Sequence, residues 1–298
     1  MIITNHLDAS QSAQVADLEA LCKKYESLQG SIFLSNELNF DTTLPCFYLL
    51  YNPENTEELI AFLSIFAPLS DEAEIYAYTA PTWRRQGCFN TLLEAALNTL
   101  WEYGIDNVLF VHEPASSDAS AVLRTLGTAY QYSEYLLTLQ KASVFADAAL
   151  PNELVLLPAS EEDLDPLTEI HALAFKEEKT EARQFLANVF DSCTSHAKKL
   201  ICTDTGELVG FCCFTIGRND ISIFSVAIHP AHHRKGCAAG MLKCLIGSFC
   251  KAYPHHSVTL EVNSQNTAAF SLYRKLGFAI TTQFDYSLAD CGKLLSLF

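Results

Sequence analysis

The chain has 298 residues, 49% of them hydrophobic, and a formal net charge of −16 at pH 7. This length suits two domains with separate cores, and the longest apolar stretch, Leu59 to Leu69, is too short to span a bilayer. The acidic balance argues against a nucleic acid partner, because binding to a phosphate backbone depends on Lys and Arg. The N-terminus lacks the features of a signal peptide, so we expect a cytoplasmic protein without membrane contacts.

The charge is divided unevenly between the halves. Residues 1–149 carry 6 Lys and Arg against 19 Asp and Glu, whereas residues 150–298 carry 13 against 16. An anionic cofactor should therefore be repelled less by the second half. The eleven cysteines are odd in number and form no C-x-x-C pair, so we expect reduced core residues and no metal site.

In the first half, strands and helices alternate in the predicted order. An opening strand at 2–4 precedes an amphipathic helix that begins near Asp8 or Ser10. The later predicted strands are 46–51, 59–66, 74–79, 108–112 and 130–139, and the later helices are 88–103 and 120–126.

The second half repeats this order after a break in composition at 141–152, which we interpret as a linker. Its predicted strands are 154–157, 199–203, 208–216, 221–228, 258–262 and 281–288, with helices between 161 and 193, from about 237, and from about 266. Strands mixed with helices predict an α/β fold with a mixed sheet.

The two halves also share a duplicated segment. Residues 81–93 align with 230–242 at an offset of 149, and residues 126–127 align with 276–277 at an offset of 150. Since two separated landmarks keep nearly the same spacing, we infer two copies of one unit.

Residues 226–242 read as a strand, a tight turn and the start of a helix. An apolar run ends at Pro230, and a basic turn containing Gly236 leads into apolar residues at helical spacing. A helix N-terminus offers unpaired N–H groups and positive dipole charge, which favour a phosphate, and Arg234 and Lys235 add cations. The same pattern is compatible with an ordinary strand-to-helix connection.

Residues 258–278 read as a strand, a polar turn and a short helix that Gly277 ends. Residues 266–278 follow the pattern Asn-x-x-Ala-x-x-Leu-Tyr-x-Lys-x-Gly-Phe. With the upstream turn, this pattern resembles the acetyl-CoA signature and the next helix motif of the GNAT superfamily of N-acetyltransferases. It is most similar to the bacterial ribosomal-protein alanine acetyltransferases. The resemblance covers 150–298 strongly and 1–140 more weakly, in a two-domain layout similar to that of mycothiol synthase.

The resemblance implies two GNAT-like domains, each with a mixed, mainly antiparallel splayed sheet flanked by helices. It implies domain limits of 1–140 and 153–298, joined by the linker 141–152. It also implies acetyl-CoA as co-substrate, with pantetheine along one strand and the diphosphate at the turn. The residues that it assigns to the cofactor are Val226, Ala227, Ile228, His233, Arg234, Lys235, Gly236, Cys237, Ala238 and Asn266. His233 departs from the family, which usually has Arg or Gln there.

Acetyl transfer from a thioester to an amine needs a base for the amine proton and an acid for the departing thiolate. The resemblance places Tyr273 as the acid, with a packed aromatic side chain as the alternative. It places Glu261 as the base, directly or through a chain of waters, with a solvent-facing strand residue as the alternative. Strand alternation puts Glu261 on the face opposite Leu260 and Val262.

The first copy lacks most of these groups. Leu123 stands in the position of Tyr273, Phe89 in that of Ala238 and Val111 in that of Glu261. We therefore expect a catalytically silent N-terminal half and acetyl transfer to a small-molecule or peptide amine in the C-terminal half. The contrasting hypothesis is a non-catalytic acyl-CoA-binding protein made of two decayed units. The N-terminal half keeps the phosphate-type turn, residues 84–87, so the sequence leaves open whether it still binds coenzyme A, as it does the acceptor and the oligomeric state.

Overall fold

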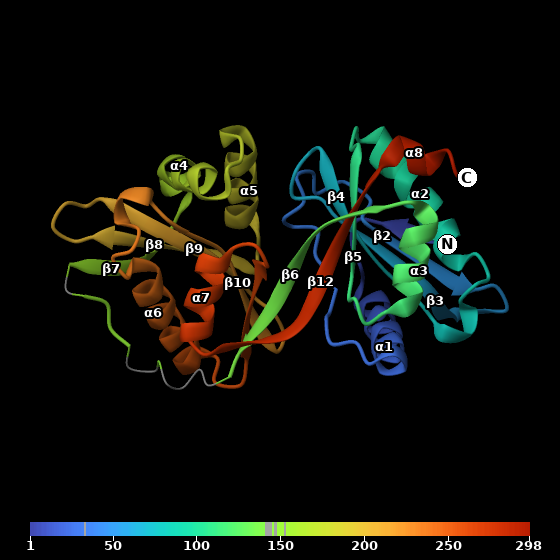
Figure 1. Ribbon diagram of the computed structural model, residues 1–298, viewed down its shortest axis with the longest axis horizontal. Helices are drawn as coiled ribbons and strands as arrows, with labels where there is room; N and C mark the ends of the chain where they lie inside the picture. The colour runs from blue at the N-terminus through green and yellow to red at the C-terminus, as the bar shows by residue number, and fades with distance from the viewer. Residues whose placement is uncertain (33, 141–144, 146–147, 152) are drawn as a thin grey trace. The chain divides into compact units, whose positions relative to one another are not determined.

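The computed structural model describes residues 1–298 except 33, 141–144, 146, 147 and 152, so most of the predicted linker 141–152 lies outside the described residues. The chain forms two compact units, which Figure 1 labels by element. The N-terminal unit comprises Met1–Glu134 and Thr282–Phe298, and the C-terminal unit comprises Tyr135–Thr281.

The N-terminal unit is an α/β unit whose strands follow the order β1-β2-β3-β4-β5-β12. All neighbours are antiparallel except β4 and β5, which run parallel. Its elements are β1 Ile2–Thr4, α1 Ala9–Glu26, β2 Phe47–Asn52, β3 Asn55–Phe66, β4 Glu72–Thr79, η1 Pro81–Trp83, α2 Cys88–Glu102, β5 Asn107–His112, α3 Ser117–Leu126, the start of β6 Ala129–Leu139, most of β12 Phe278–Asp290, and α8 Cys291–Leu295.

The C-terminal unit repeats this design with the order β6-β11-β10-β9-β8-β7. Here β10 and β11 are the parallel pair, and β9, β8 and β7 follow β10 in antiparallel pairs. Its further elements are β7 Leu154–Pro158, η3 Glu161–Asp163, α4 Leu164–Phe175, α5 Lys179–Asp191, β8 Ser195–Cys202, β9 Leu208–Ile216, β10 Asp220–Ile228, η4 Pro230–His232, α6 Cys237–Ala252, β11 Ser257–Asn263 and α7 Thr267–Lys275. The predicted α/β class with mixed, mainly antiparallel sheets is therefore confirmed.

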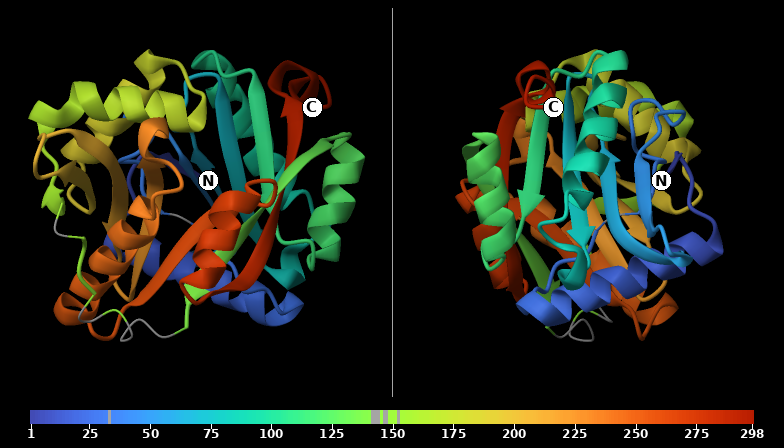
Figure 2. Two further views of the ribbon diagram at one scale, coloured as in Figure 1. Left: turned by 60° about the vertical axis from the view of Figure 1, so that its left-hand side comes forward. Right: turned by 90° about the vertical axis from the view of Figure 1, so that its right-hand side faces the viewer.

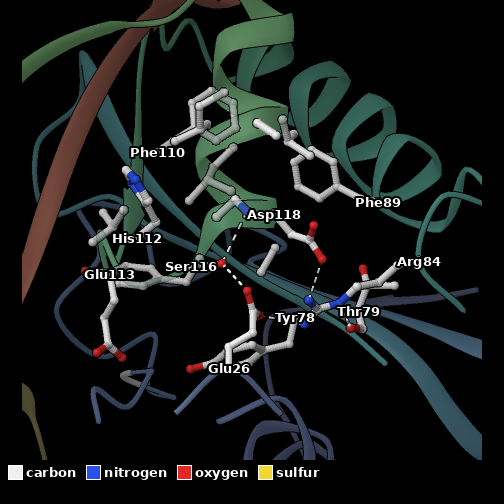
Figure 3. Close-up of a pocket in the computed structure, with 18 of the residues that line it drawn as sticks. Glu26, Tyr78, Thr79, Arg84, Phe89, Phe110, His112, Glu113, Ser116 and Asp118 are labelled. Atoms are coloured by element: carbon white, nitrogen blue, oxygen red, sulfur yellow. Dashed lines mark hydrogen bonds and ion pairs between the residues drawn. The ribbon is translucent and has the colours of Figure 1, made fainter. Parts of the chain in front are cut away.

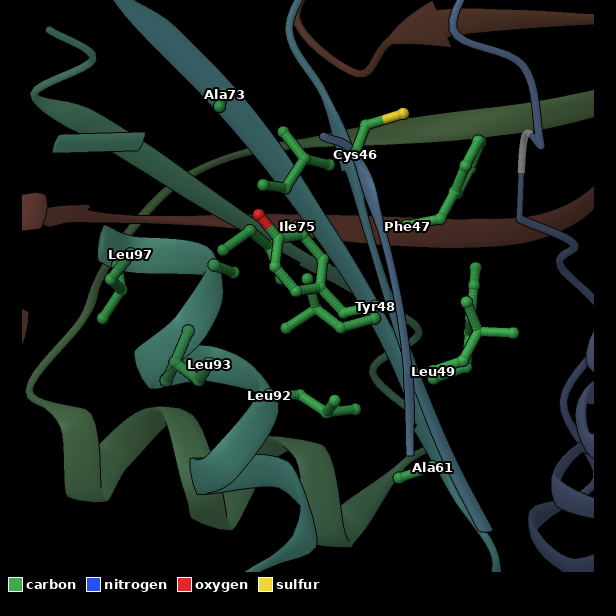
Figure 4. Close-up of a cluster of buried hydrophobic side chains, with 14 of the residues drawn as sticks. Cys46, Phe47, Tyr48, Leu49, Ala61, Ala73, Ile75, Leu92, Leu93 and Leu97 are labelled. Carbon is green, nitrogen blue, oxygen red and sulfur yellow. The ribbon is translucent and has the colours of Figure 1, made fainter. Parts of the chain in front are cut away.

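Each unit has its own apolar core beneath a long helix. In the N-terminal unit, α2 places leucines at helical spacing against β2, β3 and β4, and Figure 4 shows Leu92, Leu93 and Leu97 beside Tyr48 and Ile75. Figure 2 shows α1 across the same unit, where it contacts β3 and β4. In the C-terminal unit, α6 buries the corresponding stripe: Met241, Leu242, Leu245, Ile246 and Phe249.

The last strand, β12, contributes residues to both compact units. Residues 278–281 of β12 lie in the C-terminal unit, whereas residues 285–290 pair with residues 107–112 of β5. Conversely, β6 belongs to the first half of the sequence and borders β11. The predicted domain limits, 1–140 and 153–298, stay a prediction, and they differ from the two units mainly in this strand.

Candidate active site

The parallel strands of the C-terminal unit separate toward their C-terminal ends. The pairing of β10 with β11 runs from Asp220 opposite Ser257 to Ile223 opposite Leu260 and stops there. Beyond this point β10 (Phe224–Ile228) and β11 no longer pair with each other. Main-chain groups on the facing edges of the two strands can therefore hydrogen-bond a ligand. In the N-terminal unit, β4 and β5 separate at the matching place, after Ile75 and Phe110. These are the splayed sheets that the sequence predicts.

A bulge shapes the free end of β10. The register with β9 shifts between Phe224 and Ala227, and Ser225 adopts a φ of 47°. Such a bulge turns backbone groups away from the regular ladder. The strand opposite accommodates it with a glycine, because a Cβ on Gly210 would lie 2.4 Å from the carbonyl oxygen of Ala227. The matching strand β4 keeps a regular register with β3, so the bulge distinguishes the two units.

The turn after β10 has the backbone of an anion site. Arg234 has a φ of 64° and Gly236 has a φ of 80°, and α6 begins at the next residue, Cys237. Alternation of right- and left-handed residues before a helix gathers N–H groups into a concave cluster that suits a phosphate. Both basic residues of this turn, Arg234 and Lys235, are exposed. The turn before α2 has the same pair of positive φ values, at Arg85 and Gly87.

The side chain of His233 connects this turn to the end of β10. Its Nε2 lies 2.7 Å from the carbonyl oxygen of Ile228, five residues earlier. At the matching position in the N-terminal unit, Arg84 Nε donates to the carbonyl oxygen of Thr79 at 3.1 Å. The side chain therefore holds the turn against its strand in both units, a structural role that the sequence pattern did not reveal.

Tyr273 lies on α7 and is 7% exposed. It belongs to the apolar cluster against which Val226 and Ile228 of β10 pack, and its ring centroid lies 6.1 Å from that of Phe278. Burial raises the pKa of its hydroxyl to about 12. The structure thus buries Tyr273 in the apolar core of the C-terminal unit, with little of its surface in contact with solvent.

Glu261 begins the part of β11 that lies beyond the parallel ladder. Its side chain is exposed between the buried residues Leu260 and Val262, so the predicted alternation is correct. Desolvation by the surrounding protein raises the pKa of its carboxyl to about 6. Water still reaches this exposed side chain and offsets part of the desolvation.

Asn266 caps α7, because its Oδ1 accepts a hydrogen bond from the backbone N–H of Ala269 at 3.1 Å. Asn266 thus has the role of a helix N-cap, which is compatible with the contact to the cofactor that the family resemblance implies. Ser116 does the same for α3 by accepting from Ala119 N–H at 3.2 Å. The duplicated helices therefore begin in the same way.

A polar chain that the sequence did not reveal reaches the bulge from α4. The Nε2 of His171 lies 3.4 Å from Ser225 Oγ, and its Nδ1 lies 3.2 Å from a carboxylate oxygen of Glu177, at an angle poor for a hydrogen bond. His171 is 3% exposed and packs among the rings of Phe175, Phe185 and Phe211. The serine, the histidine and the carboxylate therefore form a row, but the contact between His171 Nδ1 and Glu177 is not a hydrogen bond. No sequence signal marked it, because its members lie in apolar or charged runs of three different segments.

Other site classes find little support in the described part of the chain. No group of three His, Cys, Asp or Glu residues there could hold a metal ion. All eleven cysteines fall within it as free thiols, and only Cys193 is exposed. No described helix is both long and apolar enough to cross a membrane.

Comparisons with known proteins agree with this geometry. The model of the acetyltransferase (GNAT) family matches residues 164–278. An L-methionine sulfoximine/L-methionine sulfone acetyltransferase of Salmonella typhimurium is 34% identical over 73 residues, which are 24% of this chain and 42% of that protein. The [ribosomal protein bS18]-alanine N-acetyltransferase of Escherichia coli is 30% identical over 76 residues, 26% of this chain and 51% of that protein. The chain thus spans about half the length of these curated relatives or less.

Two solved structures resemble the chain over nearly its whole length. A GCN5-related N-acetyltransferase from Sphaerobacter thermophilus has a TM-score of 0.71 at 15% identity and covers 96% of this chain and 95% of its own. A tandem GNAT protein from the clavulanic acid biosynthesis pathway has a TM-score of 0.69 at 15% identity and covers 98% of each. Residues 164–278 therefore match the acetyltransferase (GNAT) family model, and the chain has the fold of these two solved proteins.

Proposed function

We propose that the protein is an acetyl-CoA-dependent N-acetyltransferase that moves an acetyl group directly to a primary amine in its C-terminal unit. The observation that carries this proposal is the combination of a splayed, bulged β10 with the turn at Arg234 and Gly236. The main chain of residues 226–228 would hold the pantetheine arm. The N–H groups of residues 234–238 would hold the diphosphate, with charge from Arg234 and Lys235, whereas the N–H of His233 already donates to the carbonyl oxygen of Pro230.

In the proposed reaction, the amine nitrogen attacks the thioester carbonyl and the carbon–sulfur bond breaks. Glu261, directly or through water, accepts the amine proton, and a pKa above that of an ordinary carboxyl makes it a better base. Tyr273 stabilises the departing thiolate. Since the pKa of its hydroxyl is about 12, well above that of an ordinary thiol, it acts mainly as a hydrogen-bond donor.

The acceptor is proposed only as an amine. The names of the relatives show that such domains act on a small amino acid analogue in one case and on a protein alanine in another. The acidic N-terminal half, with Leu123, Val111 and Phe89 in place of the active-site residues, is proposed to be non-catalytic.

One observation favours the second candidate, a non-catalytic acyl-CoA-binding protein. Tyr273 is almost fully buried, and Asn266 caps a helix, so each of these two residues has a role in stabilising the fold. In this alternative, the turn still binds coenzyme A but no acetyl group is transferred.

Replacing Tyr273 by Phe separates the two functions, because it removes one oxygen and keeps the ring that packs against Phe278. For the enzyme, we expect acetyl-CoA affinity to stay the same and turnover to fall by roughly 100-fold or more, measured as thiol release with a panel of primary amines. Tyr253→Phe, at the far end of α6, is the matched control and should keep full turnover. If the parent chain releases no thiol with any amine yet binds acetyl-CoA, the binding function is the correct one.

A further inference from the structure

The N-terminal unit contains a cavity of about 480 Å³ within the size range of small-molecule sites. It lies where β4 and β5 separate and where α3 begins, as Figure 3 shows. Tyr78 and Thr79 line it from β4, and His112 and Glu113 from the end of β5. It is thus the counterpart, in the unit that has lost the catalytic residues, of the site proposed in the C-terminal unit.

One wall of the cavity is a loop held firmly in place. The buried carboxylate of Glu113 accepts hydrogen bonds from the backbone N–H groups of Gln29 at 3.0 Å and Gly30 at 2.7 Å, and from Thr282 Oγ1 at 2.6 Å. Gly30 packs so closely that a Cβ on it would lie 2.2 Å from the ring of Phe284. The cavity is therefore bounded by ordered contacts rather than by a loose surface segment.

The polar wall of the cavity is acidic. Arg84 donates to Glu26 at 2.7 Å and to Asp118 at 2.8 Å, and Ser116 Oγ donates to the other oxygen of Glu26 at 2.7 Å (Figure 3). Two carboxylates thus share the guanidinium of Arg84, whose side chain is 16% exposed, and Arg85 directs a side chain that is 91% exposed into solvent. With Glu113, the lining has three carboxylates against two arginines, Arg84 and the largely exposed Arg85.

Aromatic and aliphatic side chains make up much of the remaining lining, which also contains one buried polar atom without a hydrogen-bond partner in the described part of the chain. Phe89 and Phe110 face the cavity in Figure 3. The Nδ1 of His112, in the same lining, is buried and has no hydrogen-bond partner among the described residues. Burial lowers the pKa of this imidazole, so it is neutral at pH 7 and adds no positive charge.

These groups are the wrong ones for coenzyme A. A diphosphate needs positive charge, but the two terminal nitrogens of the Arg84 guanidinium, Nη1 and Nη2, already form ion pairs with Asp118 and Glu26. Asp118 adds a negative charge 4.0 Å from Arg85, at the turn where the diphosphate would lie. Phe89 also replaces the small Ala238 of the other unit.

We propose that this N-terminal cavity is a separate binding site for a compact organic cation with an apolar body, and that it excludes coenzyme A. The ammonium group lies against Asp118 and Glu26, and the apolar body lies against Phe89 and Phe110. The site does not depend on acetyl transfer in the C-terminal unit.

Calorimetric titration of the full chain tests the proposal with 2-phenylethylamine as the probe and 2-phenylethanol as its uncharged analogue. We expect one amine to bind per chain, at least about ten-fold more tightly than the alcohol, because the charged hydrogen bond is lost with the alcohol. Asp118→Asn should weaken amine binding by about ten-fold. Glu94→Gln, an exposed acid on α2 outside the cavity lining, is the matched control and should change nothing.

A second variant locates the site without disturbing the core. Ala121 is exposed and lines the cavity, so Ala121→Trp should obstruct the cavity in a folded chain and abolish amine binding. Coenzyme A titrated into the same variant should bind as to the parent. Equal binding of amine and alcohol, no effect of Asp118→Asn, or loss of coenzyme A binding in Ala121→Trp would each overturn the proposal. Failure of the proposed acetyl transfer would show separately, in the thiol-release assay.

Discussion

Two glycines at matching positions allow the proposed diphosphate turn to be tested with an internal control. Gly236 and Gly87 both precede a long helix, with φ of 80° and 82°. A Cβ at either position would meet no described atom within 4 Å. Alanine at each should therefore cost only the backbone strain of a left-handed residue, about 1–2 kcal/mol in the free energy of unfolding. The two variants should be equally destabilised in urea unfolding.

Their effects on coenzyme A should differ. At Gly236, the space that the new Cβ enters is the space in which a phosphate would approach the N–H groups. The loss of one charged hydrogen bond, about 1.5–3 kcal/mol, corresponds to an affinity that is roughly 10- to 100-fold weaker. Gly87→Ala should leave the affinity unchanged, since the N-terminal turn is proposed not to hold the cofactor. Calorimetry with coenzyme A measures both values. Equal loss in both variants, or loss in Gly87→Ala alone, would refute the reasoning.

Three further substitutions probe other parts of the argument. Gly210→Ala should cost more than about 2 kcal/mol in urea unfolding, because its Cβ would lie 2.4 Å from the Ala227 carbonyl oxygen and push β9 away from the bulge; a stable variant would contradict the close packing there. Glu113→Gln should cost about 1–3 kcal/mol, because its amide cannot accept from three donors, whereas exposed Glu94→Gln should cost nothing. Ser225→Ala should keep acetyl-CoA affinity and slow thiol release by roughly 100-fold if the His171 row carries the amine proton; an unchanged rate would exclude the row from catalysis.

Local patterns explain why much of the fold was predictable. The stripe from Met241 to Phe249 and the alternation around Glu261 depend only on periodicity, which a single segment determines. The turn before α6 was also recognisable, because its glycine suits the positive φ that the segment itself requires at Gly236.

The features that the sequence did not show all depend on distant residues meeting. The His171 row joins a helix, a loop and a strand bulge, and nothing in any of the three announces the others. The bulge itself was hidden because Ser225 looks like an ordinary residue within an apolar strand. Likewise, the pairing of residues 285–290 with β5 requires the end of the chain to return to a sheet whose strands lie nearly 180 residues earlier in the sequence. Alternation fixes which face a strand buries but not which neighbour it pairs with.

The proposed base gives a prediction in which stability and activity move in opposite directions. The pKa of Glu261 is raised from 4.5 to about 6 by desolvation, so the folded chain binds this proton more tightly than the unfolded chain does. The free energy of unfolding should therefore fall as the pH rises from about 4.5 to about 6, and stay lower above that. Thiol release should rise over the same range, because only the carboxylate can accept the amine proton.

Glu261→Gln cannot ionise, so it should be at least as stable as the parent above pH 6 and should release thiol much more slowly. Its pH–rate profile should lack the rise near pH 6 that the parent shows. Thermal denaturation at pH 5 and pH 8 and the rate profile from pH 5 to 8 measure both effects, with exposed Glu153→Gln as the control that should follow the parent. A glutamine variant that keeps the rise near pH 6 would assign the base to another group, and the His171 row, which reaches the same strand from α4, is then the first place to look.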